Sequence, residues 1–235
     1  MFFYEQSNEE RDFTTEEGWR IRGGHRLWLA PENIDTYCPD NESISYCIQD
    51  ETITLYQKTD RRLGVKKSIQ ISFGKGASVS LVHGIQNCKQ EAITRSLWAI
   101  SAMAPGGTEV IPLGHQKESM SPYQHISWWD NTCLNDERVT YRKESIQIKH
   151  LPIRSEYKIG IWRPDGCVCY INRGVIFEKS YDMRRDAIYP DGNVSFETFF
   201  CVHMAEMESL SPLITIAPGE SAYHKEIWTL RRVQG

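Results

Sequence analysis

The feature that most constrains this chain is a two-residue alternation of apolar and polar side chains that recurs along most of its length. Residues 68–73 alternate strictly, and in 79–85 every odd position except His83 is apolar. Such alternation predicts half-buried β-strands. Similar runs lie at 93–102, 108–113, 145–150, 158–162, 167–171, 174–178, 195–204, 213–217 and 222–231. Turn-forming sequences such as PGG at 105–107 and PDG at 190–192 separate them.

Ten or more strands with few helices predict an all-β fold, either a sandwich or a barrel. Two short polar segments, 8–17 and 131–138, are weak helix candidates. Nothing along the chain resembles a linker, an internal repeat or a shift in composition, so we expect one domain over residues 1–235. A chain of 235 residues is long enough to bury an ordinary hydrophobic core.

Charge and motif content exclude several classes of function. The chain has 27 Lys and Arg against 31 Asp and Glu, so we expect no nucleic-acid or anionic-membrane partner. No apolar stretch is long enough to span a bilayer and the N-terminus turns acidic early, so we expect a cytoplasmic protein. Seven cysteines without a CxxC pair indicate reduced thiols. Dinucleotide, P-loop, nucleophile-elbow and HExxH motifs are absent, so we expect no cofactor and no metal.

The most unusual segment is 23–32, where a Gly-Gly pair precedes His25, Arg26, Trp28 and Glu32. As a strand, it would place His25 on one face and both Arg26 and Trp28 on the other. An indole beside charged groups suits a sugar, whose ring can stack on the indole while its hydroxyls bind the charges. The alternative is a structural strand, with Trp28 in the core and Arg26 paired with Glu32.

Three further positions have both a structural and a functional interpretation. Asn41 ends an acceptor-rich turn whose ordinary explanation is an Asx turn, although it follows the His25 segment closely. His83 shares a strand face with apolar residues, which favours a histidine at the edge of the core over a catalytic one. Trp98 is best explained by core packing.

The best acid–base candidates lie in the C-terminal third. If 196–210 ran as one straight strand, Glu197 would lie on one face and both Glu206 and Glu208 on the other. Two carboxylates about 7 Å apart along a strand can differ in proton affinity when one is desolvated. A solvated strand face is the alternative. In the last strand, His224 and Glu226 share a face that is either a site wall or an ordinary rim.

Together these segments resemble a bacterial family catalogued as a domain of unknown function and related to the galactose-mutarotase-like superfamily. The resemblance covers nearly the whole chain and rests on GGHRLWLAPE at 23–32, PDN at 39–41, APGG at 104–107, EMESLSP at 206–212 and APGE at 217–220. It implies a β-supersandwich of two large antiparallel sheets whose concave face binds a small-molecule carbohydrate. It also implies that one or two strands precede the position of Met1 in the family.

The resemblance also implies roles for individual residues. In aldose mutarotases a carboxylate removes the proton from the anomeric hydroxyl and a histidine protonates the ring oxygen. Glu206 or Glu208, ahead of the Pro-Gly-Glu turn, resembles that carboxylate. Where mutarotases have their acid histidine, this chain has Leu97-Trp98, so His25 becomes the candidate acid.

Two functions follow from these features. The first is an aldose epimerase-like enzyme with Glu206 or Glu208 as base and His25 as acid. Its substrate-binding residues would be Arg26, Trp28, Glu32, Asn41, His83, His224 and Glu226. The second is a carbohydrate-binding module without catalysis, and a scaffold that binds nothing is the least specific alternative. The catalytic hypothesis requires His25 and the acidic pair to meet in one groove.

Overall fold

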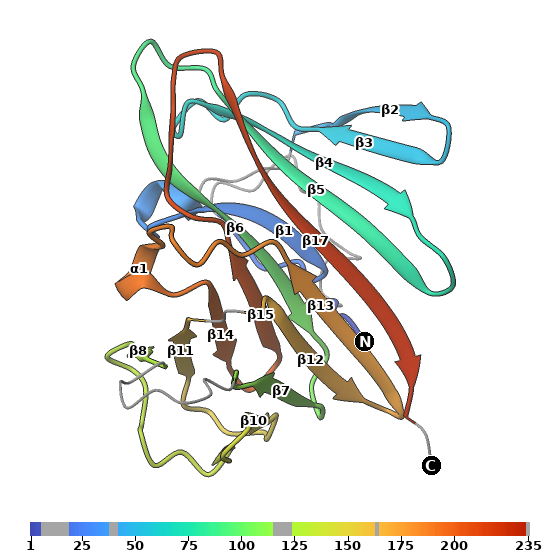
Figure 1. Ribbon diagram of the computed structural model, residues 1–235, viewed down its shortest axis with the longest axis vertical. Helices are drawn as coiled ribbons and strands as arrows, with labels where there is room; N and C mark the ends of the chain where they lie inside the picture. The colour runs from blue at the N-terminus through green and yellow to red at the C-terminus, as the bar shows by residue number, and fades with distance from the viewer. Residues whose placement is uncertain (6–18, 38–41, 115–123, 163–164, 234–235) are drawn as a thin grey trace.

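The structure is a computed structural model that describes residues 1–5, 19–37, 42–114, 124–162 and 165–233. The described chain consists almost entirely of antiparallel strands arranged in two large sheets (Figure 1). This confirms the predicted all-β sandwich. Within the described residues, no helix combines the length and the apolar character needed to cross a membrane.

The smaller sheet has seven strands among the described residues. Its order is β1 (His25–Ala30), β6 (Ile93–Met103), β15 (Ala205–Leu210), β14 (Phe196–Phe200), β11 (Tyr157–Ile161) and β8 (Ile126–Trp128). The seventh strand, β16 (Ile214–Ile216), pairs with the start of β6. β15 and β14 lie at the centre, and β15 also pairs with β6, so residues far apart in sequence become neighbours there.

The larger sheet has ten described strands. Its order is β2 (Ser45–Gln49), β3 (Thr52–Tyr56), β4 (Val65–Phe73), β5 (Ser78–Asn87), β17 (Ser221–Arg232), β13 (Val175–Tyr181), β12 (Cys167–Asn172), β7 (Thr108–Pro112), β10 (Ser145–Lys149) and β9 (Val139–Tyr141). Two short helical segments, η3 (Ile34–Tyr37) and α1 (Pro190–Asn193), complete the described structure. In α1, Asp191 and Gly192 have φ of 52° and 82°, so this segment is the turn predicted at 190–192.

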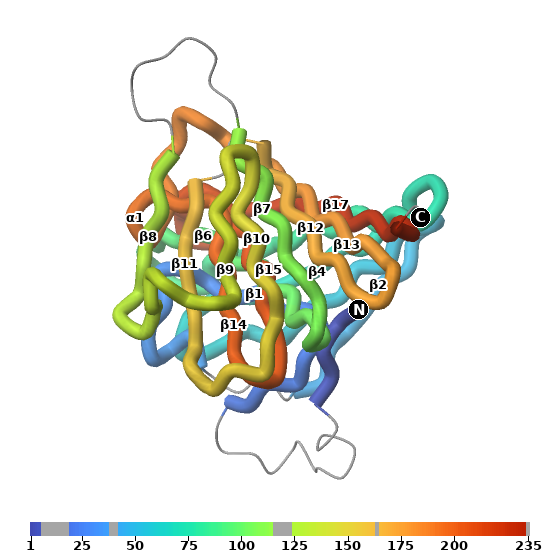
Figure 2. Tube along the Cα trace, turned by 90° about the horizontal axis from the view of Figure 1, so that it is seen from below, coloured from blue at the N-terminus to red at the C-terminus, as the bar shows by residue number. Residues whose placement is uncertain are grey.

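Figure 2 shows β9 and β10 of the larger sheet passing in front of β14 and β15 of the smaller one. The main core lies between the two sheets. Ile159 and Met207 of the smaller sheet pack there with Ile148 and Phe177 of the larger one. Because side chains alternate along a strand, the residues between these core positions point to the opposite face of the smaller sheet. That outer face is the one that carries the polar groups described below.

The helix predicted at 131–138 is wrong: this segment forms turns that lead into β9. Asp136 and Arg138 hold the turn, because the carboxylate of Asp136 accepts hydrogen bonds from both the backbone and the guanidinium of Arg138. Local hydrogen bonds of this kind compete with helix formation. The other helix candidate, 8–17, lies outside the described residues.

The single strand predicted at 195–204 is also wrong. The chain turns between β14 and β15, where the Cys201 amide donates to the Met204 carbonyl at 3.0 Å. In the resulting hairpin Glu197 lies opposite Glu208, and Phe199 lies opposite Glu206. Glu197 therefore shares a face with both carboxylates, which is the reverse of what a straight strand would give.

Candidate functional site

The outer face of the smaller sheet contains a cavity of about 400 Å³, which we call the tryptophan pocket. Strands β1, β6, β11, β14 and β15 all contribute to its walls. Its lining residues are Trp19, Ile21, Arg26, Trp28, Glu32, Tyr37, Trp98, Trp129, Asn131, Glu156, Lys158, Phe199, Met204 and Glu206. This cavity thus combines four indoles with both positively and negatively charged side chains.

Arg26 and Glu206 form an ion pair at one side of the tryptophan pocket. Arg26 Nη1 donates to Glu206 Oε1 at 2.9 Å, although 180 positions separate the two residues. The guanidinium lies 4.3 Å from the ring centroid of Trp28, in cation–π geometry. Arg26 therefore pairs with Glu206 and not with Glu32, and the predicted separation of Arg26 and Trp28 from His25 is confirmed.

Lys158 neutralises a second set of carboxyls at the base of the pocket. Its Nζ lies 2.9 Å from Glu197 Oε2 and 3.4 Å from Glu208 Oε2. Trp98 Nε1 also donates to Glu208 Oε2, at 2.8 Å. Lys158 is itself stacked between indoles, 4.7 Å from the Trp98 ring and 4.9 Å from the Trp129 ring. Trp98 is thus buried, as predicted, but it also belongs to the site.

The proton affinities of these groups follow from burial and from their neighbours. Burial raises the pKa of both Glu197 and Glu208, although the Lys158 ammonium acts in the opposite direction. Burial alone would lower the pKa of Lys158, but the two carboxylates outweigh it and raise this pKa. Lys158 is therefore protonated, and Glu197 and Glu208 hold their protons to a higher pH than a free glutamate does.

Tyr37 and Glu32 close another side of the pocket. The Tyr37 hydroxyl donates to the Glu32 carboxylate. Burial, together with this hydrogen bond, raises the pKa of Tyr37 to about 12. The Tyr37 ring packs edge-on against Trp28 at 5.1 Å between centroids, and Trp19 packs on Trp28 at 4.9 Å. These three rings form a continuous aromatic wall.

His25 lies on the other face of the same sheet, so the expectation that it shares a groove with Glu206 and Glu208 is wrong. Its Nε2 is 2.7 Å from His83 Nε2, and its Nδ1 is 3.0 Å from Ser101 Oγ. Both partners lie between the two sheets. The reason is strand alternation, which sends His25 inward whenever Arg26 points outward.

His83, His224 and Glu226 lie with His25 in what we call the inter-sheet network. This corrects their prediction as residues of the same groove as Arg26, because the smaller sheet separates them from the tryptophan pocket. Lys179 Nζ is 2.8 Å from Glu226 Oε1, and both side chains are fully buried. Lys179 also donates to the backbone carbonyls of two strands of the smaller sheet, at Ala99 and Met207.

The hydrogen bonds of the inter-sheet network fix its proton positions. His83 Nδ1 contacts the His224 carbonyl at 3.2 Å, and because a carbonyl only accepts, His83 carries its proton there. Ser209 donates to the Glu226 carboxylate and so accepts from His224 Nε2, at 2.7 Å. Burial lowers the pKa of all three histidines, that of His224 to about 3. The histidines are therefore neutral at pH 7.

Lys179 determines the charge state of the remaining carboxylate. Burial would raise the pKa of Glu226, but the Lys179 ammonium and the three nearby histidines together outweigh burial, so this pKa is lowered. Glu226 is consequently ionised, and its oxygens also accept from Ser209 and from Trp228 Nε1. The network thus satisfies its own hydrogen bonds and charges within the chain.

Two described side-chain clusters have donor atoms close enough to hold a metal ion, all within 4.8 Å of one another. One consists of His25, His83 and Glu226, and the other of Cys167, Cys169 and Glu178. In the first, the His25–His83 hydrogen bond and the Lys179 ammonium already satisfy the donor atoms. We therefore assign no metal to it.

The sequence-predicted site residues divide into three groups. Arg26, Trp28, Glu32 and Glu206 line the tryptophan pocket, and Glu208 lies at its base. His25, His83, His224 and Glu226 lie in the inter-sheet network. Asn41 lies outside the described residues. The prediction missed Lys158 and Glu197, for which the only sequence signal is a charged residue within an otherwise apolar strand.

Comparisons with known proteins establish the fold but not the activity. No protein-family model and no curated protein sequence matches the chain. The Slr1438 protein from Synechocystis sp. PCC 6803 superposes with a TM-score of 0.62 at 10% identity, covering 99% of this chain and 84% of that one. Together with the two mutarotase-like structures described next, this match shows that the fold is galactose-mutarotase-like.

Two further solved structures agree with this assignment. A galactose mutarotase-like protein from Lactobacillus casei ATCC 334 gives a TM-score of 0.55 at 9% identity, over 89% of this chain and 85% of that one. The GalM/aldose epimerase homologue from C. elegans gives 0.56 at 8% identity, over 94% and 79%. At identities this low, the comparisons show the fold but not the activity, which has to be argued from the residues of the site.

Proposed function

We propose that this protein binds a carbohydrate in the tryptophan pocket. The observation that carries the proposal is the convergence of the Arg26–Glu206 ion pair and the Lys158 ammonium with four indoles in one cavity. Carboxylates accept hydrogen bonds from sugar hydroxyls, and guanidinium or ammonium groups donate to sugar oxygens. Indole faces pack against the apolar face of a sugar ring. The galactose-mutarotase-like fold supports the same ligand class.

Proton transfer at the anomeric carbon is the second candidate. It is favoured by Glu206, whose carboxylate lines the pocket, whereas Glu197 and Glu208 are buried beneath it. A positioned carboxylate is a common general base in proton transfer. Glu206 would be the proton acceptor. His25 has no part in this version, because it faces the inter-sheet network.

Titration calorimetry against a panel of neutral sugars, amino sugars and sugar acids tests the binding proposal. We expect saturable binding to the wild type and at least about tenfold weaker binding to Glu206→Gln, because hydrogen bonds to charged groups contribute about 1.5–3 kcal/mol. Glu220→Gln, in an exposed turn, is the matched control and should bind like the wild type. Saturable binding to none of the sugars at millimolar concentration would contradict the proposal.

Anomer exchange of the bound sugar, followed by NMR, separates the two candidates. Acceleration by the wild type that is lost in Glu206→Gln supports catalysis. Binding without acceleration supports recognition alone. Thermal unfolding of each variant shows whether a loss of binding reflects a loss of folding, since Glu206→Gln leaves the Arg26 charge without its partner.

A further inference from the structure

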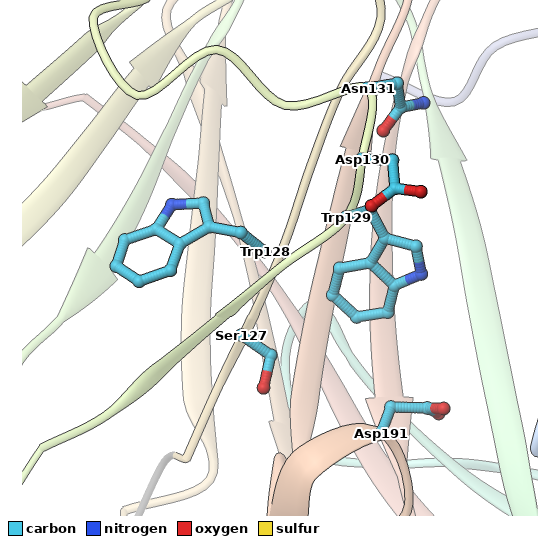
Figure 3. Close-up of a pocket in the computed structure, with 6 residues that line it drawn as sticks. All are labelled: Ser127, Trp128, Trp129, Asp130, Asn131 and Asp191. Atoms are coloured by element: carbon cyan, nitrogen blue, oxygen red, sulfur yellow. The ribbon is translucent and has the colours of Figure 1, made fainter.

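A second, larger cavity adjoins the tryptophan pocket. It has a volume of about 610 Å³ and is lined by Ser127, Trp128, Trp129, Asp130, Asn131 and Asp191 (Figure 3). Trp129 and Asn131 line both cavities. The two cavities are therefore neighbours that share the wall formed by these two residues.

We propose that this second cavity binds the next sugar unit of an oligosaccharide whose first unit occupies the tryptophan pocket. The inference rests on the proposed carbohydrate-binding function and specifies its substrate class. A single sugar ring in the tryptophan pocket would leave the larger cavity unfilled, whereas a linked pair of rings would use both. The neighbouring cavity is thus the feature that favours an oligosaccharide over a free monosaccharide.

The lining of the second cavity suits sugar hydroxyls. Ser127, Asn131 and the carboxylates of Asp130 and Asp191 offer hydroxyl, amide and carboxylate partners. No lysine or arginine is among its described lining residues, so a phosphate group or a uronic acid would meet two carboxylates and no cationic lining residue. The chemistry therefore favours a neutral sugar unit at this position.

The two residues that frame the cavity are held in place by the fold. Trp129 lies 4.9 Å from Lys158, which the buried carboxyls of the tryptophan pocket fix in turn. Asp191 belongs to the turn of α1, where Gly192 packs so closely on β8 that a Cβ there would lie 2.5 Å from Ser127 Oγ. Figure 3 shows the Trp129 indole above Asp191, with the Trp128 indole directed to the other side of the chain.

Ser127 and Asp130 provide variants that affect the second cavity alone. Both line it, and neither lines the tryptophan pocket. Replacing either residue by alanine removes only the side-chain atoms beyond Cβ, so folding should not be disturbed. Tyr223, 64% exposed on β17 in the larger sheet, offers a control that lines neither cavity.

Calorimetry with paired sugars tests the inference on the full chain: glucose against cellobiose and maltose, galactose against lactose, and mannose against mannobiose. We expect at least one disaccharide to bind about tenfold or more tightly than its monosaccharide, a gain of about 1.4 kcal/mol. Ser127→Ala and Asp130→Ala should each reduce that advantage to about twofold or less and leave monosaccharide affinity unchanged. Tyr223→Ala should bind both like the wild type.

The possible failures are distinguishable. Equal affinity for every monosaccharide and its disaccharide would overturn the second subsite but leave the proposed function in place. A disaccharide advantage that survives in both Ser127→Ala and Asp130→Ala would also overturn it, because the second unit would then lie elsewhere. Binding of no sugar at all would overturn both proposals.

Discussion

Glu109, on β7, is a carboxyl buried in the space between the two sheets. Its Oε2 accepts a hydrogen bond from Thr198 Oγ1 at 2.6 Å, and within the described residues its Oε1 has no hydrogen-bond partner. Burial raises the pKa of Glu109 to about 8, well above the ordinary value of a glutamate. The folded protein therefore retains a proton here that the unfolded chain loses.

This difference predicts the direction of a pH effect on stability. The contribution of Glu109 is fully present below the pKa of the unfolded chain, 4.5, and is lost as pH rises through about 8. Each pH unit in that window is worth up to about 1.4 kcal/mol. Glu109→Gln removes the titration, so its melting temperature should fall less than that of the wild type between pH 5 and pH 8. Parallel pH profiles of the two proteins would contradict this.

At the scale of residues, the sequence predicted which face a side chain takes but not which partner it meets. Alternation correctly separated Arg26 and Trp28 from His25. It did not indicate that His25 would meet His83, because the partner depends on how two distant strands pack. The pairing of Arg26 with Glu206 was likewise set by the order of strands and not by any local spacing.

At the scale of elements, the Gly-Gly pair before β1 has a specific structural role. Gly23 has a φ of 87°, and a Cβ on it would lie 2.1 Å from the Phe3 carbonyl oxygen. Gly24 has a φ of 71°, and a Cβ on it would have no atom within 4 Å. Its amide donates to the same Phe3 carbonyl at 2.9 Å. Gly23 therefore lets residues 1–5 approach the start of β1.

These two glycines form a matched pair for mutation. Gly24→Ala should cost about 1–2 kcal/mol, the penalty for a left-handed backbone conformation in a residue with a Cβ. Gly23→Ala adds a clash with backbone and should cost clearly more. Urea unfolding of both variants measures the difference. Equal losses would show that the contact between Phe3 and Gly23 contributes nothing to stability.

Most strands could be predicted from sequence because one of their faces is buried. The turn at 201–204 could not, because CVHM contains none of the Gly, Pro, Asn or Asp residues that usually mark a turn. Missing this turn also placed Glu197 on the strand face opposite Glu206 and Glu208 and so left it out of the predicted site. The strand β2 was missed for the opposite reason: all five of its residues are exposed, so it lacks the alternation that burial imposes.

At the scale of the whole molecule, Lys179 connects the two sheets. It belongs to β13 in the larger sheet, yet it donates to carbonyls of β6 and β15 in the smaller one. Its partner Glu226 is equally buried on the adjacent β17. Breaking a buried ion pair leaves an uncompensated charge, which costs about 3–5 kcal/mol.

Lys179→Met should therefore destabilise the protein by about that amount, whereas the double variant Lys179→Met/Glu226→Gln should recover part of the loss. Chemical unfolding of the wild type, both single variants and the double variant gives the coupling energy. Additive losses would show that the two side chains do not interact. The tryptophan pocket lies on the other side of the smaller sheet, so sugar binding by the folded variants should be unaffected.

The all-β architecture could be predicted from the sequence because the alternation of apolar and polar residues recurs in strand after strand. The sequence did not predict which polar residues lie in the tryptophan pocket and which in the inter-sheet network, because each placement depends on individual contacts across the sandwich. Four of the predicted site residues, His25, His83, His224 and Glu226, lie close to one another in space. They lie on the opposite face of the smaller sheet from the tryptophan pocket.

Strand β15 separates the two environments one residue at a time. Glu206 and Glu208 face outward to the indoles, while Met207 and Ser209 face inward to the core and to Glu226. Deleting or inserting one residue within β15 would exchange these sets and bury two acids in the core. We therefore expect insertions and deletions to be tolerated in the flanking loops but not within these six residues. Their alternation keeps the carboxylates of the tryptophan pocket on one face of the sheet and the core side chains on the other.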